Sequence, residues 1–73
     1  MKLFDIVTLI KDLPELKLYR GQVGTIVEQY DPQIFEVEFS DMKGRTYALE
    51  TLKEEQLMVL RYQPCEEREK LSA

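Results

Sequence analysis

The sequence predicts an all-β protein, a small five-stranded barrel with one short 3₁₀ turn before its last strand. Three observations favour this fold class. Runs rich in β-branched and aromatic residues recur about every ten residues between turn-forming residues, which is the spacing of a small barrel or sandwich. One run alternates strictly between apolar and polar residues. A chain of 73 residues is also too short to cover sheet edges with helices, whereas closure into a barrel removes those edges.

The first half of the chain contains two predicted strands and a long loop. The run FDIVTLI predicts a strand over 4–10, because apolar and β-branched residues dominate it. A proline excludes a central strand from 11–21, which we interpret as a partly packed loop ending in a turn at Gly21. The run VGTIVEQY predicts the second strand over 23–30. Its apolar pattern slips phase once, so we predict a β-bulge at Gly24, where positive φ is tolerated.

The clearest predicted strand is the run IFEVEFSD, over 34–41. Every second residue is apolar, so one face packs on the core and the other is solvated. The core face carries Phe35, Val37 and Phe39, and the solvated face carries Glu36 and Glu38. An Asp-Pro pair before this run predicts the turn that joins it to the second strand.

The last third of the chain predicts two more strands with a helical turn between them. The run RTYALE predicts a strand over 45–50, and LMVLRY predicts a short last strand over 57–62. Between them, Thr51 and Glu54 fit the N-cap and N3 positions of a capping box, which predicts the 3₁₀ turn.

The charge is unevenly distributed along the chain. Residues 1–60 form the predicted barrel, and 61–73 are predicted to be a charged, flexible tail, because they have almost nothing to bury. The tail holds three basic and three acidic side chains, so the net charge of −4 lies on 1–60. An acidic domain repels a phosphate backbone, which makes nucleic acid an unfavoured partner and a basic protein a favoured one.

The sequence offers no enzyme, cofactor or metal chemistry. There is no histidine, the commonest general base at neutral pH, and a single cysteine, Cys65, supplies neither an intrachain disulfide nor a zinc site. Gly21 and Gly24 lead into a strand without the lysine and helix of a phosphate-binding loop. The N-terminus lacks the unbroken apolar run of a signal peptide, and no run is long enough to span a membrane. We therefore expect a soluble cytoplasmic protein that is not an enzyme.

The order of the predicted elements matches an SH3-like barrel, in which a long loop joins the first two strands and a 3₁₀ turn precedes the last. The segment RGQVGTIVE is similar to the KOW-type element of such barrels, a glycine-containing turn that feeds a β-branched strand. The wider pattern of residues 1–60, including FDIVTLIKDLPE and FEVEFSDMKGRTYALE, resembles a family of small bacterial proteins that is frequent in cyanobacteria. That family is catalogued only as a domain of unknown function. Some members are encoded beside another small protein, in the manner of toxin–antitoxin pairs, so the resemblance implies a protein partner and no activity.

The leading functional hypothesis is a protein-interaction module with an acidic binding face. Glu28, Glu36 and Glu38 lie on the predicted second and third strands, and crowded like charges on a sheet face are slightly destabilising. Such a face suits a more basic protein, because complementary charge raises the association rate and selectivity. An antitoxin-like or immunity-like acidic protein is the specific form of this hypothesis. The simpler interpretation is that these glutamates are solvated and discourage aggregation.

Three alternatives remain open from the sequence. The first is KOW-type nucleic-acid or ribonucleoprotein binding through a basic patch formed by Lys17, Arg20, Lys43 and Arg45. The second is a structural subunit of a homo-oligomer. The third is a groove for a proline-rich segment, lined by Tyr19, Tyr30 and Tyr47. The sequence names neither the partner, the oligomeric state nor the biological process.

Overall fold

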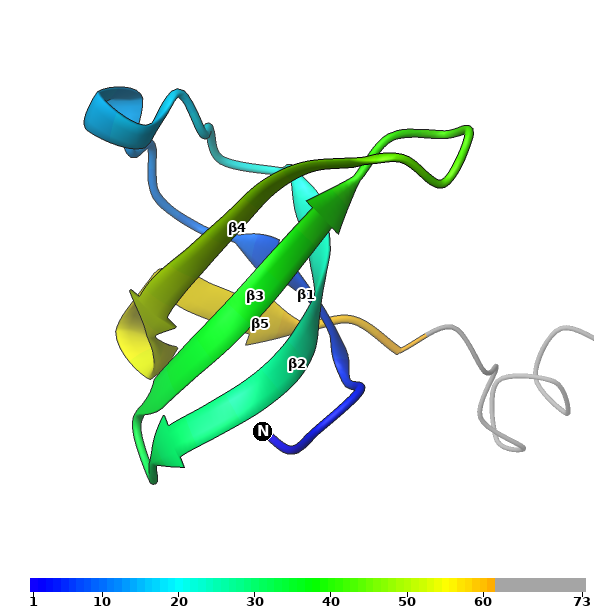
Figure 1. Cartoon of the computed structure of the whole chain (residues 1–73). Helices are drawn as coiled ribbons and strands as arrows, with labels where there is room; N and C mark the ends of the chain where they lie inside the picture. Colours follow the sequence, from blue (N-terminus) through cyan, green and yellow to red (C-terminus); the bar gives the residue numbers. More distant parts are fainter. Residues whose placement is uncertain (62–73) are drawn as a thin grey trace, which may run out of the picture.

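The computed structural model, which describes residues 1–61, contains one antiparallel sheet of five strands in the order β4-β3-β2-β1-β5 (Figure 1). The strands are β1 (Ile6–Leu9), β2 (Val23–Asp31), β3 (Ile34–Ser40), β4 (Thr46–Lys53) and β5 (Leu57–Val59). The 3₁₀ turns are η1 (Pro14–Leu16) and η2 (Glu54–Gln56). The all-β prediction is confirmed, with η2 before the last strand, and the single sheet is consistent with a small barrel-like fold. The sequence does not predict η1.

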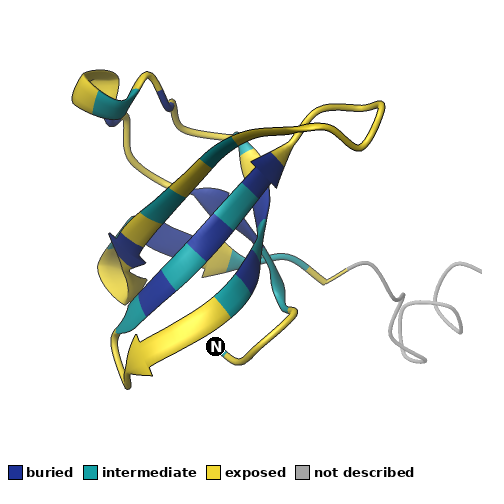
Figure 2. Ribbon diagram, viewed as in Figure 1, coloured by how far each residue is buried: buried dark blue, intermediate teal, exposed yellow. Residues whose placement is uncertain are grey.

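The buried apolar side chains of residues 1–61 form one hydrophobic core against one face of this sheet. Along β3, buried residues alternate with half-buried ones (Figure 2), and the three apolar residues predicted to face the core are fully buried. Burial of each large apolar side chain contributes about 1.5–3 kcal/mol. The core side chains are those of Val7, Leu9, Leu13, Leu18, Ile26, Phe35, Val37, Phe39, Leu52 and Leu57.

The long loop between β1 and β2 is held against the core, as predicted. Leu13 and Leu18 are both buried, and each donates its backbone N–H to the carbonyl of the other, at 2.8 and 3.2 Å. η1 is the tight turn enclosed by this pair. Gly21 ends the loop with φ +96, and its N–H donates to the carbonyl of Leu9 at 2.8 Å. The predicted turn at Gly21 is therefore confirmed.

The predicted β-bulge at Gly24 is wrong. The register of β2 against β3 shifts between Ile26 and Glu28, and again between Gln29 and Asp31, so the phase slip occurs further along the strand. Gly24 itself has no positive φ. Glycine is needed here because there is no room for a side chain. A Cβ at this buried position would lie 2.7 Å from a side-chain atom of β3.

The predicted capping box at Thr51 is also wrong. β4 continues to Lys53, because Thr51 pairs with β3 and the neighbouring Leu52 is buried in the core. The strand pairing outweighs the local capping preference of a threonine. The residue before η2 is Lys53, and its backbone N–H donates to the side-chain Oε1 of Gln56 at 2.9 Å.

The first and last strands are shorter than predicted. β1 begins at Ile6, because Phe4 adopts φ +70, a left-handed conformation that a strand cannot contain. β5 ends at Val59. Except for Arg61, the predicted tail lies outside the described residues.

Candidate functional site

The strands β2, β3 and β4 share a face that points away from the core, which we call the outer face. Directly paired residues of neighbouring strands lie on the same side of a sheet. Because Val37, between Glu36 and Glu38, points into the core, the two glutamates and their partners point outward. The residues placed on the outer face by the strand register are Thr25, Glu28, Asp31, Ile34, Glu36, Glu38, Leu49, Thr51 and Lys53. The structure thus brings the three predicted glutamates onto one face.

Two of these glutamates lie directly opposite each other on neighbouring strands. Glu28 of β2 is the register partner of Glu36 of β3, and like charges in this position are destabilising. One carboxylate oxygen of Glu36 accepts a hydrogen bond from the Thr51 hydroxyl at 2.8 Å, which leaves its charge uncompensated. Within residues 1–61 the ion pair of the protein is Asp41–Arg45, which lies elsewhere. The Glu28–Glu36 pair therefore has no cation partner in the described part of the chain.

Tyr30 reports the negative potential near this pair. Its side chain is 59% exposed at the end of β2. Partial desolvation, the charge of Glu36 with a hydrogen bond to its carboxylate, and the charge of Glu28 together raise the pKa of the Tyr30 phenol. All of these causes disfavour the phenolate, because desolvation penalises its charge, the hydrogen bond needs the phenol proton, and a third anion beside two carboxylates is electrostatically unfavourable.

Glu38 lies in the neighbouring row of the outer face. It pairs with Thr25 on one side and with Leu49 on the other, and its side chain is half-buried. Leu49 is 50% exposed, so the acidic row has an apolar border along β4. Lys53, the last residue of β4, adds a cation to this border. It pairs with Ile34, which lies on the same face of β3 as Glu36.

The four basic residues of the alternative patch lie in two loops at one end of the sheet. Lys17 and Arg20 belong to the β1–β2 loop, and Lys43 and Arg45 belong to the β3–β4 loop. The start of β2 pairs with the end of β3, so both loops leave the sheet at the same end. No hydrogen bond joins these four side chains to one another within the described residues.

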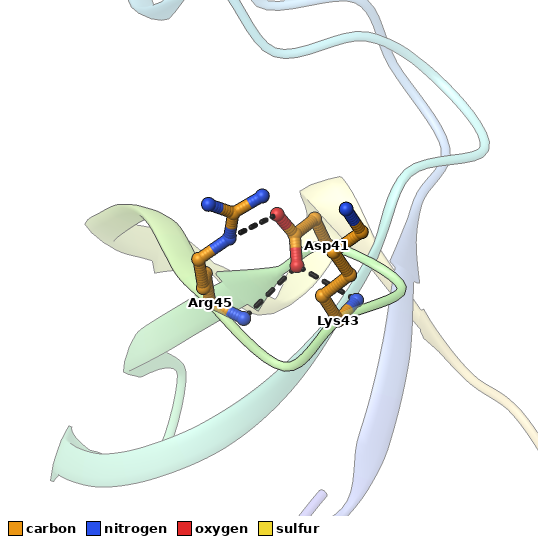
Figure 3. Close-up of polar contacts among 3 residues, drawn as sticks. All are labelled: Asp41, Lys43 and Arg45. Carbon is orange, nitrogen blue, oxygen red and sulfur yellow. Dashed lines mark hydrogen bonds and ion pairs between the residues drawn. The ribbon is translucent and has the colours of Figure 1, made fainter.

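Asp41 organises the β3–β4 loop and compensates one of these cations. Its Oδ1 accepts the backbone N–H groups of Lys43 and Arg45, both at 2.9 Å (Figure 3). Its Oδ2 lies 3.3 Å from Nε of Arg45. Because this carboxylate already neutralises Arg45, the loop presents a weaker positive charge than its two basic residues alone predict.

Residues 3–59 of the chain match a family model described as "Domain of unknown function (DUF4926)". The chain belongs to this family. The match extends over all five strands of the DUF4926 domain and includes the three outer-face glutamates. No curated protein and no solved structure matches the chain.

The DUF4926 domain also has a depression where the β2–β3 turn meets η2. The backbone N–H of Glu54 donates to the carbonyl of Gln33 at 2.9 Å and holds the two segments together. The residues that line the depression are Gln33, Ile34, Lys53, Glu54 and Glu55. Over residues 1–61, no three histidine, cysteine, aspartate or glutamate side chains are grouped so that they could hold a metal ion. No helix in the same stretch is long and apolar enough to cross a membrane.

Sequence reasoning misses two neighbours of the acidic pair. It makes Thr51 a cap, and it places Tyr30 only in a peptide groove. Extending the alternation of β4 through Thr51 places its side chain on the outer face. Tyr30 lies within the register shift between Gln29 and Asp31, which no local sequence signal specifies.

Proposed function

We propose that the DUF4926 domain is a protein-interaction module whose outer face binds a basic partner protein. The observation that carries the proposal is the direct pairing of Glu28 with Glu36, without a cation partner among residues 1–61. A lysine or arginine placed between these carboxylates relieves their repulsion and forms charge-assisted hydrogen bonds. A complex with a basic protein supplies this relief, which favours association.

The composition of the face suits recognition rather than chemistry. Glu28 is exposed, whereas Glu36 and Glu38 are half-buried and therefore held in place by neighbouring strands. Tyr30 adds an exposed aromatic ring, a residue type that is enriched at interfaces. The proposal accordingly assigns binding to this face and no reaction. An antitoxin-like acidic protein paired with a basic partner is the form that agrees with the family resemblance.

The test compares the wild-type protein with a Glu28→Gln, Glu36→Gln, Glu38→Gln triple variant. Both are used to capture proteins from an extract of the source cells, and the captured partner is then purified for binding at several salt concentrations. We expect a basic partner, weaker binding by the variant, and a smaller dependence of its affinity on salt.

A matched variant controls for the change in net charge. Glu15→Gln, Glu54→Gln and Glu55→Gln remove three negative charges at exposed positions outside β2, β3 and β4. This variant should bind like the wild type. Equal loss of binding by both variants, or no loss by either, would contradict the assignment to the outer face.

A second candidate function is nucleic-acid binding at the end of the sheet where the two basic loops lie. The supporting observation is that the exposed rings of Tyr19 and Tyr47 lie in or beside these loops, and exposed aromatic rings beside cations can stack with bases. A salt titration with single-stranded RNA and DNA tests it. Affinity that falls with salt and is lost in a Lys17→Gln, Arg20→Gln variant would support this candidate, and no binding at low salt would eliminate it.

A further inference from the structure

The free edge of β4 directs unpaired backbone groups away from the sheet. In an antiparallel pair, residues alternate between those that exchange hydrogen bonds with the neighbouring strand and those that do not. The N–H of Glu54 donates to the carbonyl of Gln33 at 2.9 Å, which fixes this alternation for the β3–β4 ladder. Leu49 and Thr51 therefore point their N–H and C=O groups outward. Lys53 has the same phase, and its N–H indeed bonds to a side chain outside β3.

This edge is open in the described part of the chain. The sheet order places β4 at the edge, and no strand of residues 1–61 pairs with its other side (Figure 1). Leu49 and Thr51 are both exposed. β4 has no proline, and its register shift lies near its start, so neither a proline nor a β-bulge protects the edge from Leu49 to Thr51.

Glu50 makes the edge selective for charge. It pairs with Val37, so its side chain lies on the core face of β4, half-buried and with no ion-pair partner in residues 1–61. An inward charge on an edge strand opposes pairing with another copy of the same strand. In the symmetric pairing centred on Glu50, two Glu50 carboxylates would lie opposite each other. A strand with a basic residue at that place would instead form an ion pair.

The other face of the edge has two carboxylates beside Leu49 and Thr51, and Lys53 at its C-terminal end. Glu36 and Glu38 lie on β3, one strand inward from Thr51 and Leu49. A strand added to β4 would lie about 10 Å from β3, two strand spacings, and long lysine or arginine side chains can reach part of that distance. Both faces of the edge therefore complement a basic strand, whereas a second copy of this chain would bring its own carboxylates.

We propose that the free edge of β4 binds an extended, basic segment of the partner protein as an additional strand. Leu49 and Thr51 supply the backbone hydrogen bonds, and Glu50, Glu36 and Glu38 select basic side chains on the two faces. The inference rests on the proposed function, because it takes the partner to be basic, and it adds the mode of binding. Main-chain pairing of this kind gives affinity, and side-chain contacts give specificity.

The experiment uses a synthetic probe, the peptide acetyl-Lys-Lys-Thr-Lys-Lys-Thr-Lys-amide, which presents lysines on both faces of an extended strand, and the full chain at low salt. Amide hydrogen exchange is measured by NMR with and without the peptide. We expect slower exchange at Leu49 and Thr51, while Ala48, Glu50 and Leu52, which already bond to β3, change little. The same peptide with every backbone amide of its seven residues N-methylated has equal charge but lacks their N–H donors, and it should give no protection.

Two variants separate this inference from the proposed function. Leu49→Pro removes an outward N–H without removing a hydrogen bond to β3, so it should weaken peptide binding. The N-methylated peptide tests the same backbone hydrogen bonds without altering the protein. If the peptide binds through the glutamates but leaves Leu49 and Thr51 unprotected, strand addition is overturned and the acidic binding face stands. If Glu28→Gln, Glu36→Gln and Glu38→Gln leave binding and protection intact, the acidic face is not the site, the selection by Glu36 and Glu38 is overturned, and strand addition stands with Glu50 alone as the selecting charge.

Two further outcomes would overturn the inference. One is no detectable binding of the peptide at low salt. The other is protection of Leu49 and Thr51 without peptide, together with a mass that doubles with protein concentration in sedimentation equilibrium. The second result would assign the edge to a homodimer.

Discussion

Gly24 occupies a position in β2 where a single methyl group has no room. A Cβ would lie 2.7 Å from Cγ1 of Val37, 2.9 Å from the carbonyl oxygen of Glu38 and 3.0 Å from Cδ1 of Phe39. We predict that Gly24→Ala lowers the free energy of unfolding by about 1–3 kcal/mol, the usual range for overpacking a core. Denaturant unfolding of the purified variant measures this change.

A double-mutant cycle with Val37→Ala identifies the cause. Removing Cγ1 relieves the shortest contact, so the two substitutions together should destabilise less than the sum of each alone. Gly44→Ala is the control, because Gly44 has φ +81 and a methyl group added there would meet nothing within 4 Å. Its effect should add to that of Val37→Ala. Additivity in both cycles would show that space is not the reason for Gly24.

The pKa of Tyr30 tests the electrostatics of the outer face. It is raised by partial desolvation and by the carboxylates of Glu36 and Glu28. Glu36→Gln should therefore lower the Tyr30 pKa toward the ordinary value of about 10, measured by an NMR-resolved titration. Glu38→Gln removes the same charge from the same strand, and Glu38 is not among the causes of the shift, so it should move this pKa less.

The same shift sets the direction of a pH effect on stability. The folded state disfavours the phenolate, so the unfolded chain loses this proton first as the pH rises above about 10. The contribution of Tyr30 is thus present below that pH and is lost as the pH rises through the higher pKa of the folded state. Glu36→Gln should make the loss of stability in this range shallower, and an unchanged slope would contradict the assigned cause.

At the scale of elements, the sequence predicts a strand correctly where a local pattern decides its structure. It fails where a partner distant in sequence decides it. The alternation of β3 predicts its core face correctly. Phe35, Val37 and Phe39 all point into the core, and the strand is paired on both sides. The prediction for Thr51 is wrong, because a local capping pattern competes with a partner in β3 that is distant in sequence.

The candidate site shows the same difference between what local patterns predict and what strand pairing decides. Glu36 and Glu38 follow from alternation within one strand, so sequence alone places them on one face. That Glu28 lies opposite Glu36 depends on the register shift after Ile26, which is a property of the pairing rather than of either strand. Local patterns therefore predict which residues share a face, but not which residues meet across it.

The cap of η2 gives a prediction at this scale. The side chain of Gln56 accepts the N–H of Lys53 at 2.9 Å, at the point where the chain leaves β4 for β5. Gln56→Ala should lower the free energy of unfolding by about 1 kcal/mol, as for other caps, and should speed exchange of the Lys53 amide. Glu55→Ala alters an exposed neighbour in the same turn and should do neither. Equal effects of the two substitutions would mean that the cap contributes nothing specific.

At the scale of the whole molecule, the acidic charge opposes folding as well as favouring a basic partner. The net charge of −4 lies on residues 1–60, and Glu28 and Glu36 concentrate part of it in one directly opposed pair. Self-repulsion of this kind destabilises the compact state and is screened by salt. The isolated domain should therefore be less stable at low than at moderate ionic strength.

Glu28→Gln isolates the contribution of the opposed pair. It should raise the free energy of unfolding by about 0.2–1 kcal/mol at low salt, the range of cross-strand pair energies, and the gain should shrink as salt is added. Glu15→Gln, at an exposed site outside the sheet, removes the same charge and should change stability less. A gain in stability accompanied by weaker binding of the basic partner would mean that this pair is retained for recognition at the expense of folding. A gain with unchanged binding would contradict that role and leave the pair as an uncompensated repulsion.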